Sequence, residues 1–108
     1  MARSRSYETD LVEALKDPEE AAEYLTAALE DGDPEVFLLA LRTVADAHGG
    51  MGRLSRAANL NRESLYRMLS GQGNPRLRSL DALLHAMGLR LAVEADPRER
   101  ATGGRSLS

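Results

Sequence analysis

The segment between Met51 and Leu80 is rich in arginine: six arginines stand there against one acidic residue, Glu63. A guanidinium group keeps its charge in proteins and can donate two parallel hydrogen bonds to a phosphate or to the edge of a guanine base. A single arginine is as readily a solvated surface charge. Six of them beside one acid favour an anionic partner, so this segment is predicted to bind nucleic acid.

Residues 54–67 carry the sequence pattern of two helices joined by a tight turn. Helices that cross closely need small side chains where they touch, and Ser55 and Ala58 supply them. The turn needs a residue that tolerates a left-handed backbone, and Asn59 is the best choice after glycine. Asn61 then caps the second helix. Because these features fall in register, they predict a helix-turn-helix.

The second helix of this motif would turn its polar side outward, since Leu65 and Leu69 take its inward positions. Such a helix meets base edges in the major groove of DNA with its outward and N-terminal residues. The candidates for base contacts are Arg62, Glu63, Ser64, Tyr66 and Arg67. The candidates for phosphate contacts are Arg53, Arg56, Asn74, Arg76 and Arg78. Tyr66 fits a half-buried core position equally well.

Helices must position this motif, because leucine and alanine dominate the chain, isoleucine is absent and only four valines are present. Two helix starts are marked by Asp-Pro-Glu, at residues 17–19 and 33–35, where the aspartate is the N-cap and the proline the first helical residue. The expected helices lie at about residues 9–15, 18–31, 34–47, 51–58, 62–70 and 77–87.

Residues 7–95 are expected to form a single helical domain, because a chain of 108 residues buries one modest core. Acidic N-terminal helices take up residues 7–32 and a helix-turn-helix core residues 33–88. Residues 89–94 alternate apolar and polar side chains and predict a short strand, which needs a partner strand, most simply from a second copy in a homodimer. The flanking segments, expected to be a flexible N-terminus and a disordered tail, are residues 1–6 and 96–108.

The composition excludes several classes of protein. The chain has no cysteine, which rules out a disulfide scaffold, a Cys-ligated zinc module and a thiol nucleophile. No apolar run approaches the roughly 20 residues that cross a bilayer, so the protein is expected to be cytoplasmic, without a membrane partner. His48 and His85 are interpreted as surface or capping residues. No catalytic residue, metal site or cofactor is predicted, and the protein is not expected to be an enzyme.

The net charge of −3 conceals two opposed halves. Residues 1–50 hold 4 basic and 12 acidic side chains, a charge of −8, whereas residues 51–108 hold 10 basic and 5 acidic ones, a charge of +5. Opposed halves suggest two different partners. Alternatively, acids gather at helix N-termini because of the helix dipole, which accounts for Glu19, Glu20 and Glu35.

The helix expected at residues 34–47 is apolar on most sides, which predicts a place at the centre of the core. Its polar stripe consists of Glu35, Arg42 and Asp46, and Leu39 falls on the same stripe. Leu39 either belongs to a surface for a partner or is covered by the N-terminal helices.

Four stretches of the chain carry a family resemblance: Glu-Tyr-Leu and Ala-Leu-Glu-Asp-Gly-Asp-Pro within 23–34, Asn-Arg-Glu-Ser-Leu-Tyr-Arg-Met-Leu-Ser-Gly at 61–71, Gly-Asn-Pro at 73–75 and Ala-Met-Gly-Leu-Arg-Leu at 86–91. With them, residues 7–95 resemble the addiction-module antidote proteins, a HigA-like branch of the Xre/Cro-repressor superfamily. The resemblance implies an all-α fold of five to six short helices that contains an Xre/lambda-repressor-like helix-turn-helix. The departures are conservative: asparagine replaces the usual turn glycine and the usual cap serine, and Arg76 replaces a capping serine or threonine.

The resemblance also implies a function, that of the antitoxin in a type II toxin-antitoxin module. Such an antitoxin neutralises a small basic toxin of the RelE/HigB type, an mRNA-cleaving ribonuclease, and represses the shared operon by binding double-stranded operator DNA as a homodimer. The acidic half would meet the basic toxin with complementary charge. The expected toxin contacts are Glu19, Glu20, Glu23, Glu30 and Leu39. Two alternatives stay open: a stand-alone Xre-family transcriptional regulator without a toxin, and an interaction domain that neutralises a partner but has lost DNA binding.

Overall fold

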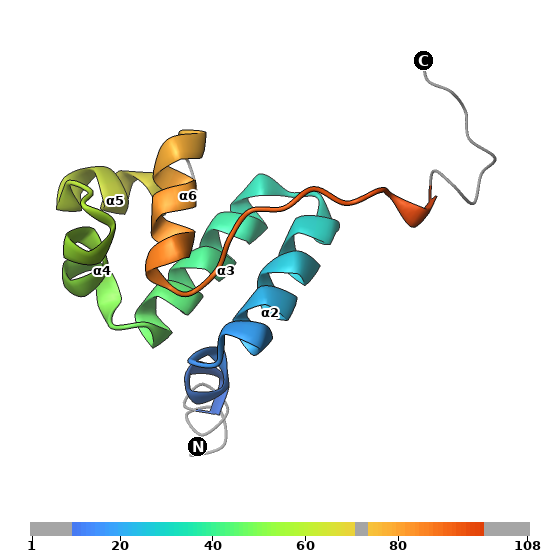
Figure 1. Cartoon of the computed structure of the whole chain (residues 1–108), viewed down its shortest axis with the longest axis horizontal. Helices are drawn as coiled ribbons and strands as arrows, with labels where there is room; N and C mark the ends of the chain where they lie inside the picture. Colours follow the sequence, from blue (N-terminus) through green and yellow to red (C-terminus); the bar gives the residue numbers. More distant parts are fainter. Residues whose placement is uncertain (1–9, 71–73, 99–108) are drawn as a thin grey trace.

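The chain folds into helices joined by short connections (Figure 1), in a computed structural model that describes residues 10–70 and 74–98. A first helical segment at residues 10–15 precedes five further helices. These are α2 (Pro18–Asp31), α3 (Pro34–Ala47), α4 (Gly50–Ala58), α5 (Arg62–Met68) and α6 (Leu77–Ala86). With six helices and no strand among the described residues, the predicted all-α fold is confirmed.

The two Asp-Pro-Glu sequences start α2 and α3 as predicted. The Asp17 carboxylate accepts a hydrogen bond of 3.1 Å from the backbone N–H of Glu19, and Asp33 accepts one of 2.9 Å from Glu35. Gly32 adopts a left-handed backbone, with φ +90°, and ends α2 immediately before the second cap. The connection is therefore so short that α2 and α3 pack side by side as a helical hairpin (Figure 1).

Helix α3 lies at the centre of the core, as its apolar sequence predicts. It packs against α2 on one side and against α4 on the other. Leu41 and Val44 are completely buried on α3, and each of the other helices adds buried leucines or methionines to the same cluster. Helix α4 contacts both α5 and α6, so the two short helices are held against the core through α4.

The strand predicted at residues 89–94 is not present in the structure. The backbone N–H of Leu89 donates to Leu84 O at 2.8 Å, which closes the end of α6, and Gly88 takes the left-handed conformation there. Residues 89–96 then run as a segment without regular secondary structure (Figure 1). The expectation was wrong for the single chain because no other described segment pairs with residues 89–94 as a strand. The side chain of Val93 in this segment is 99% exposed.

Some predictions concern segments outside the described residues. The expected flexible N-terminus at 1–6 lies outside them, as do residues 99–108 of the expected disordered tail. Residues 7–95 as a single domain stay a prediction. No helix in the described part of the chain is long and apolar enough to span a membrane.

Candidate nucleic-acid and protein-partner surfaces

Helices α4 and α5 are joined by the tight turn that the sequence predicts. Asn59 has φ +57° and ψ +44°, and among the described residues other than glycine it alone has a positive φ. The backbone N–H of Leu60 donates to Ser55 O at 2.8 Å, which fastens the turn to α4. The Asn61 side chain caps α5 by accepting hydrogen bonds from the backbone N–H groups of Glu63 at 2.8 Å and Ser64 at 3.1 Å. The left-handed turn and the cap are thus both confirmed.

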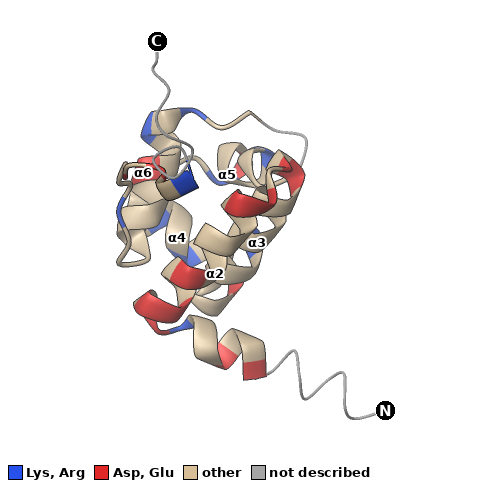
Figure 2. Ribbon diagram, turned by 90° about the vertical axis from the view of Figure 1, so that its right-hand side faces the viewer, with Lys and Arg blue, Asp and Glu red and all other residues tan. Residues whose placement is uncertain are grey.

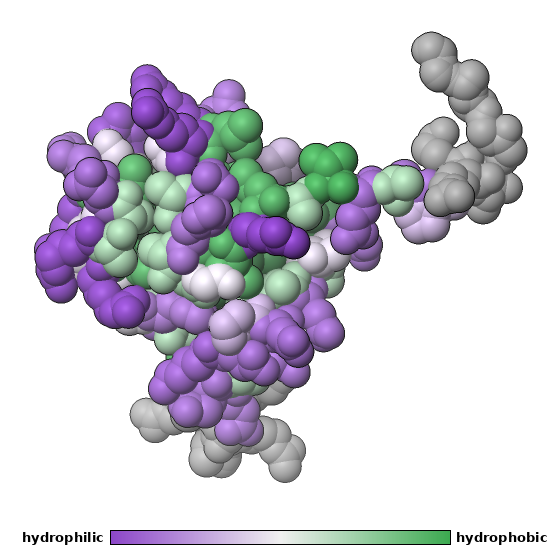
Figure 3. All heavy atoms as spheres, viewed as in Figure 1, coloured by the Kyte–Doolittle hydropathy of each residue, from purple (hydrophilic) through white to green (hydrophobic). Residues whose placement is uncertain are grey.

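All five candidates for base contacts lie on the exposed side of α5. The inward residues Leu65 and Met68 are buried, at 0% and 6% exposure, and they anchor the helix in the core. Tyr66 is 45% exposed, so its ring is open to solvent on the same side as the charged residues. Figure 3 shows hydrophilic residues along the outer edge of the molecule at α4 and α5. A helix anchored on one side and polar on the other can present its outer side to a nucleic acid without changing its packing.

A polar hollow of about 320 Å³ lies between α5 and the start of α6. It brings together two candidates from each set: Ser64 and Arg67 from α5, and Asn74 and Arg76 from the segment before α6. Met68, Pro75 and Ser79 complete the lining. Two guanidinium groups beside hydroxyl and amide donors form an environment that suits a phosphate.

Arg56 of α4 and Arg62 of α5 form a second pair of arginines, beside Gly52 of α4. Atoms of the Arg56 and Arg62 guanidinium groups both lie within 4 Å of the position that a Cβ on Gly52 would take. Arg62, a candidate for base contacts, therefore lies beside Arg56, a candidate for phosphate contacts. None of the ion pairs among the described residues involves either arginine. Two like charges held near each other without a counter-ion favour the binding of an anion.

The other two phosphate candidates, Arg53 and Arg78, do not join these groups. Arg53 folds back against Gly49, and its guanidinium donates a hydrogen bond of 3.0 Å to the carbonyl oxygen of His48. It thereby caps the end of α3. Sequence reasoning missed this role, although a glycine break followed by an arginine was the available signal. Arg78 is exposed on α6 and does not line the polar hollow.

The acidic residues cover the opposite part of the molecule: Figure 2 shows them along α2, whereas arginines surround α4 to α6. The four glutamates expected to contact a partner, Glu19, Glu20, Glu23 and Glu30, are all exposed on α2. Leu39 is 58% exposed, so the interpretation in which the N-terminal helices cover it is wrong.

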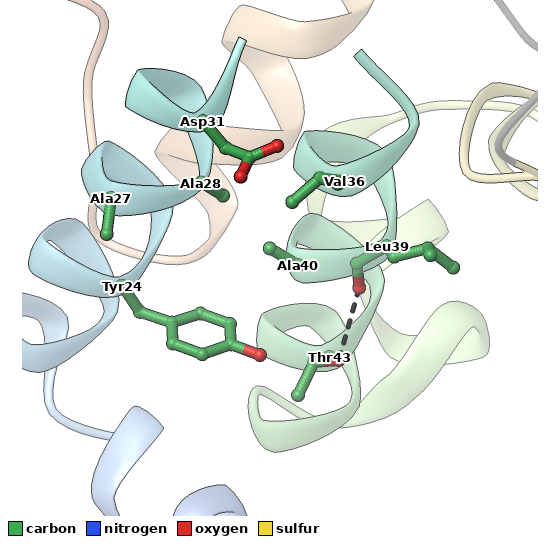
Figure 4. Close-up of a pocket in the computed structure, with 8 residues that line it drawn as sticks. All are labelled: Tyr24, Ala27, Ala28, Asp31, Val36, Leu39, Ala40 and Thr43. Carbon is green, nitrogen blue, oxygen red and sulfur yellow. Dashed lines mark hydrogen bonds between the residues drawn. The ribbon is translucent and has the colours of Figure 1, made fainter. Parts of the chain in front are cut away.

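Leu39 belongs to an apolar groove of about 420 Å³ between α2 and α3 (Figure 4). The four glutamates do not line this groove, but Asp31 does. Sequence reasoning also missed Tyr24 and Val36 in the lining, because the pairing of α2 with α3 decides which side chains share a groove.

The two histidines have structural surroundings. The Nε2 atom of the half-buried His48 lies 2.8 Å from the backbone oxygen of Leu15, which links α3 to the first helical segment. His85 is exposed, and its Nε2 lies 3.5 Å from a carboxylate oxygen of Asp81, one turn earlier on α6. No group of three potential metal ligands gathers anywhere in the described residues.

One comparison with known proteins names a family for the chain, and another finds a similar protein. A family model described as "Probable addiction module antidote protein" matches residues 5–95. A protein of Haemophilus influenzae, described as uncharacterized, is 35% identical over 85 residues, which cover 79% of this chain and 87% of that protein. No solved structure matches the chain.

Proposed function

The chain belongs to the family of probable addiction module antidote proteins, and on this premise we propose that it represses its own operon and neutralises a RelE/HigB-like toxin. Membership in the family implies an antitoxin role and a toxin partner in general. The proposal adds a HigA-like, Xre-type mode of DNA binding and an mRNA-cleaving toxin. The observation that carries it is the separation of two charged surfaces, with arginines around α5 that form no ion pair with another described residue and with exposed acids on α2.

The DNA-binding part of the proposal rests on the placement of α5. In this proposal α5 enters the major groove with its exposed side, and Arg62 and Arg67 contact base edges. Arg56, which lies beside Arg62, holds a backbone phosphate on one flank of α5. The polar hollow with Arg76 holds another phosphate on the other flank. Contacts on both flanks would fix the register of the helix on the duplex.

We also propose a homodimer in which residues 89–94 of two copies pair as strands. These residues leave α6 as an extended segment, with Leu91 41% exposed and Val93 99% exposed. Pairing with a second copy would satisfy the backbone of this segment and cover both side chains. A dimer would place two copies of α5 on two half-sites, so the operator should contain an inverted repeat.

The DNA proposal is tested with the promoter of the gene itself. Fluorescence anisotropy should show tight binding to a promoter duplex and much weaker binding to a duplex of shuffled sequence. A dimer that makes about 6–10 phosphate contacts should lose on the order of 10³–10⁵-fold in affinity between 50 and 200 mM salt. Equal affinity for both duplexes would contradict sequence-specific repression, and no DNA binding at all would favour the interaction domain without DNA binding.

The toxin proposal is tested by expressing the short basic protein encoded beside this one. Expressed alone, it should arrest growth and shorten cellular mRNA, and co-expression of the antidote should reverse both effects. The two proteins should also co-purify as a stable complex. If the neighbour is harmless and does not co-purify, the stand-alone regulator is the better description. Growth arrest without mRNA cleavage would instead contradict the RelE/HigB type of toxin.

A further inference from the structure

The groove between α2 and α3 is a preformed apolar feature of the acidic half (Figure 4). Small side chains leave its floor open, namely those of Ala27 and Ala28 on α2 and Ala40 on α3. Two larger apolar side chains border it from α3: Val36, which is 37% exposed, and Leu39, which is 58% exposed. Exposed side chains beside an open floor can receive an apolar group from a partner without rearrangement of the helices.

The two ends of the groove are polar, and the helices around it are strongly acidic. Figure 4 shows the carboxylate of Asp31 at one end and the phenol of Tyr24 reaching toward Thr43 at the other. Residues 17–47 contain nine acidic side chains and one basic one, Arg42. No ion pair in the described part of the chain involves any of them. The occupant of the groove should therefore carry positive charge beside its apolar group.

This charge argues against the other possible occupants. A second copy of the chain would meet this face by two-fold symmetry, which sets the same patch against itself and brings acid onto acid. Nucleic acid carries the same sign of charge as the groove and is repelled. A small molecule would need several converging polar groups, whereas Asp31 is the one charged residue in the lining. A cationic protein segment satisfies both the charge and the apolar lining.

We propose that this groove holds an amphipathic, cationic segment of the toxin, whose aliphatic or aromatic anchor packs against Leu39 and Val36 while a lysine or arginine beside it pairs with Asp31. The inference rests on the proposed toxin partner and gives it a place on the molecule. The side chain of Leu39, at the outer edge of the groove on α3 (Figure 4), becomes an apolar contact beside Val36, and the glutamates of α2 steer the approach of the toxin from outside the groove.

The test measures the affinity of the purified antidote for the toxin encoded beside it, by isothermal titration calorimetry. Leu39→Ala should weaken binding at least 10-fold, since it removes an anchor. Leu39→Lys should weaken it at least 100-fold, since it also sets a positive charge against a cationic segment. Asp31→Ala should weaken binding a few-fold, and less at high salt. The matched control is Leu77→Ala, because Leu77 is 71% exposed on α6, away from the groove, and this variant should bind as the wild type does.

The outcomes separate the inference from the proposed function. If the wild type does not bind the neighbouring protein, the proposed toxin partner fails. If the wild type binds and Leu39→Lys binds equally well, the proposed toxin partner is supported but the groove is not its binding site. Promoter binding and melting temperature of each variant should match the wild type, which shows that folding is retained. As a second measurement, the toxin should slow hydrogen exchange in α2 and α3, and protection confined to other helices would overturn the inference.

Discussion

Replacing Arg62 and Arg67 together by alanine should weaken binding to the promoter duplex by roughly 30-fold to 2 × 10⁴-fold, at about 1–3 kcal/mol for each lost base contact. Both side chains lie on the exposed side of α5, one beside Arg56 and the other in the polar hollow. The change removes two charged groups without touching the buried anchors Leu65 and Met68, so the fold should persist. Fluorescence anisotropy with promoter and shuffled duplexes measures the effect.

Two controls make this result specific. Lys16→Ala together with Arg42→Ala removes the same number of exposed positive charges outside the proposed DNA and dimer interfaces and should change the affinity only slightly. Arg56→Ala should weaken binding to both duplexes to a similar extent and lower the salt dependence, as expected for a phosphate contact. An unchanged promoter affinity in the first double variant would show that α5 is not the helix that reads the sequence.

Replacing Leu41 by alanine should lower the free energy of unfolding by about 2–5 kcal/mol, and the melting temperature by roughly 10–30 °C. Leu41 is completely buried on α3, the helix that packs against both α2 and α4. Removing its branched end leaves a cavity that the surrounding helices fill only in part. Because a domain of this size is stable by about 5–15 kcal/mol, the loss is a large share of the total.

The control for this prediction lies two residues earlier on the same helix. Leu39→Ala makes the same chemical change at a side chain that is 58% exposed, and it should alter the free energy of unfolding by no more than about 0.5 kcal/mol. Thermal and urea unfolding followed by circular dichroism measure both variants. Equal losses in the two would mean that α3 is not the packing centre of the protein.

Most of the helices could be predicted because their signals are local. Aspartate followed by proline marks a helix start within three residues, and the side-chain caps at Asp17 and Asp33 follow from the same atoms. The left-handed turn at Asn59 is equally local, since few residues adopt that conformation. The strand expected at 89–94 is absent from the single chain because a strand depends on a partner, and an alternating sequence says nothing about whether a partner is present.

The candidate sites also divide into those with a local signal in the sequence and those that depend on packing between helices. The exposed side of α5 followed from helical spacing, and all five predicted residues lie there. The hollow that joins Ser64 to Arg76 depends on where α4 holds α5 and the start of α6, and the groove at Leu39 depends on the pairing of α2 with α3. Such contacts between distant positions are not encoded in any short stretch. The bend of Arg53 onto His48 has a different cause: the two residues are five positions apart, and the contact was missed because charge alone suggested a ligand contact.

The position of α3 between α2 and α4 has a consequence for genetics. One neighbour carries the proposed toxin surface and the other leads into the proposed DNA surface, yet both depend on the same buried helix. Alleles that change an exposed residue should separate the two phenotypes. A change at Leu39 should leave repression intact, and a change at Arg67 should leave growth protection intact. Alleles that change a buried residue such as Leu41 should abolish both together, although that residue touches neither partner. A screen that scores both phenotypes would therefore sort surface positions from core positions without any biochemical measurement.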